Sequence, residues 1–138
     1  MAIKVLEKES IADVAFLVES ASLNKLFEEC AGAVFSQIAD AVTVRQKVKK
    51  VITARAKTLP ELLHSFLEEI VFLKDAEQLV FNDCHAIVNG NQVTATLYGE
   101  KIDRKRNRLL NDVKAVTWNS FKAERKGKKY VAKFVLDI

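Results

Sequence analysis

The carboxylates near the end of this sequence are the groups that could form a chemical site, in this case one that binds a cation. Asp137 is followed by Ile138, whose main-chain carboxylate we expect to be free, so two anionic oxygen groups lie within a few ångströms of each other. If Asp13 lies beside that end of the chain, three carboxylates form an oxygen-rich site. Hard divalent cations such as Ca²⁺ and Mg²⁺ bind such ligands. Spacing alone favours the plainer alternative that Asp13 is a turn residue and the C-terminus is merely exposed.

Catalytic motifs of the conventional kinds are absent from the sequence. His64 and His85 are the two histidines, and neither belongs to an HxxH or HExxH pair, which argues against zinc. The chain has no GxGxxG or GxxxxGKS/T loop to cradle a phosphate and no GxSxG turn to carry a nucleophile. We therefore expect a protein that is not an enzyme, with His64 on a helix surface and His85 in a strand.

The composition is that of one folded domain spanning residues 1–138. Apolar residues make up 49% and charged residues 29% of the chain, and one Pro and four Gly leave no linker-like stretch. No apolar run approaches the roughly 18 residues that span a bilayer, and residues 1–7 lack the apolar segment of a secretory signal. We therefore expect a cytoplasmic protein without membrane contact. Cys30 and Cys84, which lack CxxC spacing, are expected to be small core residues.

Positive charge is concentrated in the last quarter of the chain. Residues 1–100 carry 10 Lys and Arg against 14 Asp and Glu, whereas residues 101–138 carry 12 against 4. Residues 101–108 hold five Lys or Arg and no aromatic ring, so base-specific recognition of a nucleic acid is not expected there. The pattern is compatible with contact to phosphate groups or to an acidic protein face, and equally with a solvated loop.

The elements that must position these groups are two helices and several strands. Apolar residues recur at helical spacing after Ser22, a good N-cap, and this helix should end near residues 39–40. The Thr58–Glu61 capping box, in which Thr58 accepts from the Glu61 amide and Glu61 reaches back, predicts a second helix. Strands are expected over 3–6, 14–18, 44–56, 79–88, 92–99, 112–125 and 129–138, with hairpin turns at Asn89-Gly90-Asn91 and Lys126-Gly127-Lys128.

This order of elements predicts an α+β fold, a single-domain sandwich in which a mainly antiparallel β-sheet carries two α-helices packed on one face. The charged segment 102–111 is expected to form a loop at the end of the sheet. Trp118 and Phe121 have opposite parity in the strand predicted over 112–125. One of these two aromatic side chains should therefore face the core and the other should face outward.

Five segments of the chain, in the same order and at comparable separations, resemble motifs of the archease family. Residues 62–77 (LLHSFLEEIVFLKDAE) resemble its helix motif, which reads roughly LLxxWLxELLFLxDTE. Residues 112–119 (DVKAVTWN) resemble its EVKAxTYH segment, and residues 135–138 (VLDI) resemble its terminal VILDI. Ala12-Asp13 matches the end of its HTAD motif, and Tyr98-Gly99-Glu100 matches its YGE. The ordered set covers nearly the whole chain.

The resemblance implies an archease-like α+β sandwich and a function. Archeases are non-enzymatic accessory proteins of the RtcB-type tRNA-splicing RNA ligase, and they promote guanylylation of the ligase and its turnover. The family's metal site uses the Asp of HTAD, the Asp near the terminus and the terminal carboxylate, which correspond to Asp13, Asp137 and Ile138. The implied cofactor is a divalent metal, with Ca²⁺ preferred and Mg²⁺ or Mn²⁺ as alternatives. The implied partner is the ligase, with weak or indirect tRNA contact through residues 101–108.

Three positions depart from the family's pattern, and each lacks a histidine. Ser10 stands where HTAD has His, Asn119 stands where EVKAxTYH ends in His, and Asn107 stands where the charged loop has a further family His. Any role that needs imidazole is therefore absent or reassigned, whereas the oxygen ligands are retained. Loss of ligase work, a stand-alone chaperone and an RNA-binding module are alternatives. A small metal-dependent hydrolase using Asp13 and Asp137 is a further one, for which the sequence offers no general base.

Overall fold

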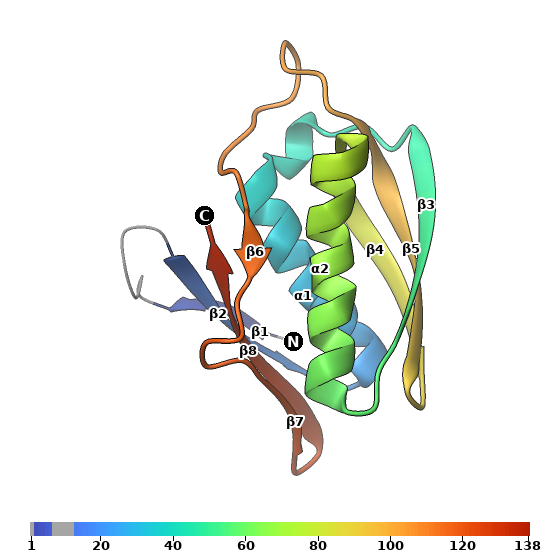
Figure 1. Cartoon of the computed structure of the whole chain (residues 1–138), viewed down its shortest axis with the longest axis vertical. Helices are drawn as coiled ribbons and strands as arrows, with labels where there is room; N and C mark the ends of the chain where they lie inside the picture. Colours follow the sequence, from blue (N-terminus) through green and yellow to red (C-terminus); the bar gives the residue numbers. More distant parts are fainter. Residues whose placement is uncertain (1, 7–12) are drawn as a thin grey trace.

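The computed structural model describes residues 2–6 and 13–138, and Ser10 lies outside these described residues. The described chain forms strands and two α-helices, and a long segment, residues 102–114, connects β5 to β6 (Figure 1). In chain order the elements are β1 (Ala2–Leu6), β2 (Asp13–Ser20), α1 (Leu23–Ile38), a 3₁₀-helix (Ala41–Thr43), β3 (Val48–Arg55), α2 (Leu59–Glu77), β4 (Leu79–Asn89), β5 (Gln92–Lys101), β6 (Ala115–Val116), β7 (Lys122–Lys126) and β8 (Lys129–Asp137).

The strands form two antiparallel sheets. One sheet has five strands in the order β1-β2-β8-β6, and β7 also pairs with β8. β6 and β7 follow one another along one edge of β8, and β2 pairs with its other edge. The second sheet has three strands in the order β3-β5-β4. β8 is therefore enclosed between strands that come from distant parts of the chain.

The two helices lie between the two sheets (Figure 1). α1 contacts β2 and β8 on one side and β4 on the other. α2 contacts β6 and β7 on one side and all three strands of the smaller sheet on the other. The predicted α+β fold, with two helices packed on antiparallel strands, is confirmed. The structure adds that the strands divide into two sheets, and a helix covered on two sides needs the broad apolar face seen in the sequence of α2.

Both helix starts follow the predicted capping chemistry. The Ser22 hydroxyl accepts a hydrogen bond from the Lys25 amide at 3.2 Å, and α1 ends where its periodicity ends. The Thr58 hydroxyl accepts from the Glu61 amide at 3.3 Å. The Glu61 carboxylate reaches back to the Thr58 hydroxyl at 2.8 Å rather than to the Thr58 amide. These side chains satisfy N–H groups that have no partner within the helix.

Both predicted hairpins are present. The turn between β4 and β5 contains Gly90 at a φ of 61°, and the turn between β7 and β8 contains Gly127 at a φ of 64°. Both angles lie in the left-handed region, which glycine enters without a steric penalty. The local turn chemistry in the sequence therefore predicted the strand pairs β4–β5 and β7–β8 correctly.

Two strand predictions differ from the structure. β3 begins at Val48 rather than at residue 44, because residues 41–43 form a 3₁₀-turn that Asp40 caps. The strand predicted over 112–125 is interrupted between β6 and β7. A turn with Ser120 at a φ of 57° separates the two short strands, so they occupy successive parts of the β8 edge.

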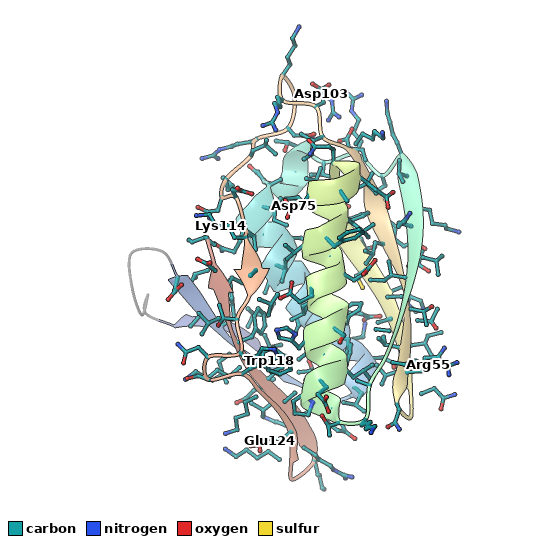
Figure 2. All side chains as sticks on the ribbon, in the orientation of Figure 1. Arg55, Asp75, Asp103, Lys114, Trp118 and Glu124 are labelled. Atoms are coloured by element: carbon teal, nitrogen blue, oxygen red, sulfur yellow. The ribbon has the colours of Figure 1, made fainter. Side chains whose placement is uncertain are left out.

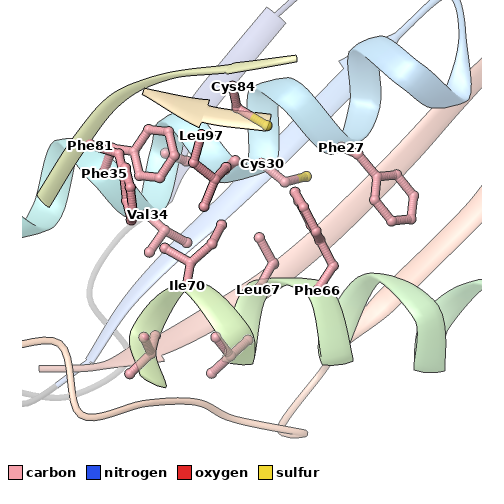
Figure 3. Close-up of a cluster of buried hydrophobic side chains, with 14 of the residues drawn as sticks. Phe27, Cys30, Val34, Phe35, Phe66, Leu67, Ile70, Phe81, Cys84 and Leu97 are labelled. Carbon is pink, nitrogen blue, oxygen red and sulfur yellow. The ribbon is translucent and has the colours of Figure 1, made fainter. Parts of the chain in front are cut away.

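The core includes apolar side chains packed between the helices and the smaller sheet (Figure 3). Cys30 and Cys84 belong to this core as free thiols, as predicted. Burial raises the pKa of both thiols, that of Cys84 to about 12, so neither forms a thiolate near neutral pH. No helix in the described ranges combines the length and the apolar character needed to cross a bilayer.

Candidate functional site

Asp13 and Asp137 lie opposite each other at one end of the pair formed by β2 and β8. The register of these antiparallel strands runs from Asp13 opposite Asp137 to Ser20 opposite Tyr130. Cross-strand partners project from the same face of a sheet, with Cβ atoms about 4.5–5.5 Å apart. The fold therefore brings together two carboxylates that belong to opposite ends of the chain.

These two carboxylates project from the face of the larger sheet that is turned away from the helices. Phe16 and Phe134 mark the opposite face, because their rings stack at a centroid distance of 5.4 Å within the core. Side chains alternate between the two faces of a strand, so Asp13 and Asp137, three positions from these phenylalanines, point the other way. Asp13, Asp137 and Ile138 are all half-buried.

Main-chain hydrogen bonds fix this end of β8. The Lys114 amide donates to the carbonyl of Asp137 at 2.7 Å, and Ala115 in β6 is the cross-strand partner of Asp137. Asp137 is thus held between β2 and β6, and Ile138 follows it directly. The three residues predicted from the sequence, Asp13, Asp137 and Ile138, therefore meet at one end of the larger sheet.

The chemical type of the ligands at the end of β2 and β8 suits a hard divalent cation. Carboxylate oxygens are the ligands that Ca²⁺ prefers, and Asp13 and Asp137 supply two such groups. Across residues 2–6 and 13–138, no three His, Cys, Asp or Glu side chains gather in a way that could hold a metal ion. Within these residues Asp13 and Asp137 are thus two acidic side chains and not a set of three, and Ile138, the third residue of the predicted set, follows Asp137 directly.

Asn107, one of the positions that lacks the family histidine, is buried and fastens the loop after β5. Its amide nitrogen donates to the carbonyl of Thr43 at 2.8 Å and to the carboxylate of Glu100 at 3.2 Å. Its side-chain oxygen accepts from the Asp103 amide at 2.8 Å. An uncharged amide thus satisfies three polar groups, and the position has a structural role. Asn119 lies elsewhere, exposed in the turn after β6.

Glu100 is a buried carboxylate that several donors stabilise. It accepts from the Arg45 amide at 2.6 Å, from the Arg106 guanidinium and from Asn107. Burial alone would raise the pKa of Glu100, but these hydrogen bonds and the charge of Arg106 outweigh burial and hold the pKa below its ordinary value. Arg106 also donates to the Thr43 carbonyl at 2.8 Å. One of the five basic residues of the loop therefore anchors the loop instead of adding to its exposed positive charge.

The pKa of Glu100 predicts how acid affects stability. Because the folded-state pKa lies below the unfolded value, the contribution of Glu100 is fully present above the unfolded pKa and is lost as pH falls through the folded pKa. We expect Glu100→Gln to be less stable than wild type at neutral pH and to lose less stability on acidification. Urea denaturation at about pH 7 and about pH 3 measures both free energies of unfolding. Glu124→Gln, at a more exposed position, is the control and should leave the wild-type acid dependence intact.

Trp118 is exposed and stacks on a buried histidine. Its ring lies 3.8 Å from the His64 ring at an interplanar angle of 11°, and 58% of Trp118 is exposed (Figure 2). Phe121 meets both rings nearly edge-on and packs against the core. The prediction that the two aromatic side chains face opposite ways is wrong, because residues 118–121 lie in the turn between β6 and β7 and not in a strand, and both rings contact His64. The expected surface position of His64 is wrong. The segment after β6 covers it, and its Nε2 lies 2.7 Å from the carbonyl of Val116. His85 is in β4, as predicted.

Lys74 is a buried lysine that the sequence reasoning missed. Its ammonium group donates to Asp112 at 2.8 Å and to the Val113 carbonyl at 2.6 Å, and it lies 2.8 Å from Asp75. Burial alone would lower the pKa of Lys74, but these partners raise it.

A cavity of about 350 Å³ lies between the end of α2 and residues 102–112. Lys74 lines this cavity, and its ammonium group is already bound to Asp112, Val113 and Asp75. The position of Lys74 among the apolar residues on the buried face of α2 is the feature of the sequence that could have predicted its burial.

Comparison with known proteins relates the chain to one family. The model of the "Archease protein family (MTH1598/TM1083)" matches residues 6–138. "Protein archease" of Methanopyrus kandleri is 35% identical over 136 residues, which cover 96% of this chain and 97% of that protein. "Protein archease" of Pyrococcus abyssi is 32% identical over 135 residues, which cover 94% of this chain and 95% of that protein.

Two solved structures share the fold. The solution structure of protein 1598 of Methanobacterium thermoautotrophicum has a TM-score of 0.80 at 22% identity, and the match covers 99% of this chain and 98% of that one. A crystal structure from Thermotoga maritima, described as "an archease, possible chaperone", has a TM-score of 0.67 at 17% identity and covers 96% of each chain. At these identities the likeness concerns the fold alone.

Proposed function

The chain belongs to the archease family, and from this premise we propose that it is a cytoplasmic, non-catalytic activator of an RtcB-type tRNA-splicing RNA ligase. In this proposal it promotes guanylylation of the ligase and its turnover. The observation that carries the proposal is the pairing of Asp13 with Asp137 next to Ile138. These are the residues that correspond to the family's metal ligands. The lack of a conventional catalytic motif in the sequence also supports a helper over an enzyme.

In this proposal a divalent cation, preferably Ca²⁺, is bound by Asp13, Asp137 and the terminal carboxylate of Ile138. The cation supplies positive charge that offsets the repulsion between carboxylates facing each other on adjacent strands. On the ligase, the same carboxylates contact the nucleotide site and help to hold the ligase's own metal ions for the reaction with GTP. This role needs anionic oxygens at a surface and no nucleophile on the activator.

Contact with tRNA is weak or indirect in this proposal. Arg104 and Lys105 are exposed in the loop 101–108, whereas Arg106 is bound to Glu100. Exposed cations without a stacking ring attract phosphates and do not read bases. A salt titration of tRNA binding tests this step, because no measurable affinity at low salt would remove tRNA contact from the proposal.

The ligase assay tests the proposed function directly. The RtcB-type ligase of the same genome is incubated with radiolabelled GTP and a divalent metal, with and without the purified chain. We expect faster formation of the ligase–GMP adduct and more ligation cycles per ligase molecule when the chain is present. An unrelated protein of similar size and charge is the control. No change at a saturating concentration of the chain, with an active ligase, contradicts the proposal.

A C-terminal extension tests the assigned third ligand. A short Gly-Ser tail after Ile138 converts the terminal carboxylate into an uncharged amide, and the same tail before Met1 is the matched control. We expect the C-terminal tail to weaken Ca²⁺ binding by about tenfold or more, since a carboxylate ligand is lost. Isothermal titration calorimetry with Ca²⁺ measures this change. Equal Ca²⁺ affinity of the two tailed proteins would exclude the Ile138 carboxylate as a ligand.

A further inference from the structure

The smaller sheet has two edges that differ in how their main-chain groups are satisfied. Its strand order, β3-β5-β4, makes β4 one edge and β3 the other. Edge strands present a row of N–H and C=O groups without strand partners, and other side chains or chains can pair with them. The main-chain N–H and C=O groups of β4 and of β3 have different surroundings.

Side chains close the β4 edge. The Ala86 amide donates to the carboxylate of Glu28 at 2.9 Å, and the Val88 amide donates to the side-chain oxygen of Asn24 at 2.8 Å. Both acceptors belong to α1, which packs along this strand. The N–H groups of this edge are thus used within the protein, and another strand would have to displace α1 to reach them.

The β3 edge is open in the described part of the chain. The Ala56 amide donates to the carbonyl of Asn91, and this bond sets which residues of β3 face β5. Inward- and outward-directed main-chain groups alternate along an antiparallel strand. The N–H and C=O groups of Lys49, Val51, Thr53 and Arg55 therefore point away from the sheet. Within residues 2–6 and 13–138, nothing hydrogen-bonds to these groups.

The side chains beside this open edge are exposed and basic. Lys49 and Arg55 flank Val51, which is 57% exposed, on the outer surface of the sheet. Figure 2 shows Arg55 projecting outward from β3. Lys47 and Lys57 extend the charge beyond both ends of the strand, and β3 carries no acidic residue.

The charge decides which chain can pair with this edge. Two copies of β3 side by side would bring lysine and arginine side chains together, so the basic edge opposes self-association. An acidic strand would instead meet opposite charge at Lys49 and Arg55, toward the two ends of the edge. We propose that β3 is an acceptor edge for an extended acidic segment of a partner protein, which adds to the smaller sheet as a fourth strand. Main-chain hydrogen bonds to the outward groups give affinity, and glutamates facing Lys49 and Arg55 give specificity.

This inference does not depend on the proposed function, and a synthetic peptide tests it. The probe is an acetylated and amidated heptapeptide that alternates glutamate and valine, and the same peptide with lysine for glutamate is the control. In ¹⁵N NMR at up to about 1 mM peptide, we expect the acidic probe to shift the amides of Lys49, Val51, Thr53 and Arg55. We also expect slower hydrogen exchange at these amides by about tenfold. No shift, or shifts centred on another element, would overturn the proposal.

Two sets of variants separate strand addition from loose charge attraction. Val51→Pro removes one outward N–H without removing a bond to β5, as edge positions allow. Val51→Thr, which keeps the N–H, is its control. Lys49→Glu with Arg55→Glu reverses the local charge, and Lys126→Glu with Lys128→Glu makes the same charge change on the β7–β8 turn.

We expect Val51→Pro and the Lys49/Arg55 double variant to weaken peptide binding by about tenfold or more, with near-wild-type affinity for both controls. Circular dichroism checks that each variant is folded. Wild-type affinity of the proline variant would mean that main-chain pairing does not hold the peptide, and the proposal would fail. Equal losses in both charge variants would also overturn it, because binding would then follow net charge and not the β3 edge.

Discussion

Asp137→Asn is expected to abolish the proposed stimulation of the ligase by this protein. The substitution keeps the shape of the side chain but removes one of the anionic groups that meet where β2 and β8 pair. Loss of groups that only orient a metal ligand costs about 10–100-fold in metal affinity. We therefore expect loss of Asp137, a proposed ligand itself, to weaken the proposed Ca²⁺ binding by about 100-fold or more. Asp13→Asn should behave in the same way, because Asp13 is the cross-strand partner of Asp137.

The measurement separates metal binding from folding. Ca²⁺ that binds only the folded protein raises its Tm, so the wild type should gain Tm on addition of Ca²⁺ and the Asp137→Asn variant should not. Without Ca²⁺ the variant should be at least as stable as wild type, because a pair of facing carboxylates has been removed. Glu124→Gln, on β7 of the same sheet, makes the same charge change as a control. Full ligase stimulation by a folded Asp137→Asn variant would refute the carboxylate mechanism.

Gly99→Ala is expected to destabilise the fold strongly. A Cβ at position 99 would lie against the carbonyl oxygen of Val80 and within 2.7 Å of the Cα of Phe81, and both neighbours are main-chain atoms. The register of β4 and β5 shifts between Phe81 and Asp83, and this bulge lies opposite Gly99. Glycine in a strand commonly marks a bulge or a close approach of backbone. The middle residue of the Tyr98-Gly99-Glu100 segment therefore has a steric requirement.

The expected cost is about 3 kcal/mol in the free energy of unfolding, since forcing an atom into packed backbone commonly costs about 1–3 kcal/mol or somewhat more. A domain of ordinary stability has about 5–15 kcal/mol in total, so the loss should be plain in a urea denaturation curve. Gly32→Ala in α1 is the matched control. A Cβ there meets nothing within 4 Å, and alanine should raise stability by up to about 1 kcal/mol. Similar stability changes in the two variants would contradict the steric explanation.

Features that depend on short stretches of sequence were predicted well. Ser22 and Thr58 cap the two helices through hydrogen bonds to the amide three residues further along the chain. Gly90 and Gly127 adopt the positive φ angles that the two hairpin turns need. Each signal is local, because the chemistry of one side chain or one φ angle decides it. The division of the strands into two sheets is different. It depends on whether β3 pairs with β5 or with a strand of the other sheet, and no local pattern encodes that choice.

The candidate site shows the same contrast. Spacing alone favours a turn residue at Asp13 and an exposed terminus at Asp137, and only the resemblance to a family pairs these two residues. The ion pair between Arg106 and buried Glu100 could not be predicted from the sequence. Glu100 lies near the end of β5, where a charged residue is usually exposed to solvent. The burial of His64 has a related cause. Trp118 and Phe121, which cover it, lie in the break between β6 and β7, and the strand pattern of the sequence does not predict that break.

The enclosed position of β8 has a consequence for the order in which the protein folds during synthesis. The smaller sheet and α2 come from one continuous stretch, residues 48–101, so their contacts can form while the ribosome is still translating the last quarter of the chain. β2 has β1 as a partner on one edge, but its other edge gains β8 only after that strand has been made. Until then Phe16 lacks the ring of Phe134 on which it stacks. Pairings between distant segments form slowly, and exposed apolar strands aggregate. The larger sheet is therefore the part of the nascent chain that most needs protection.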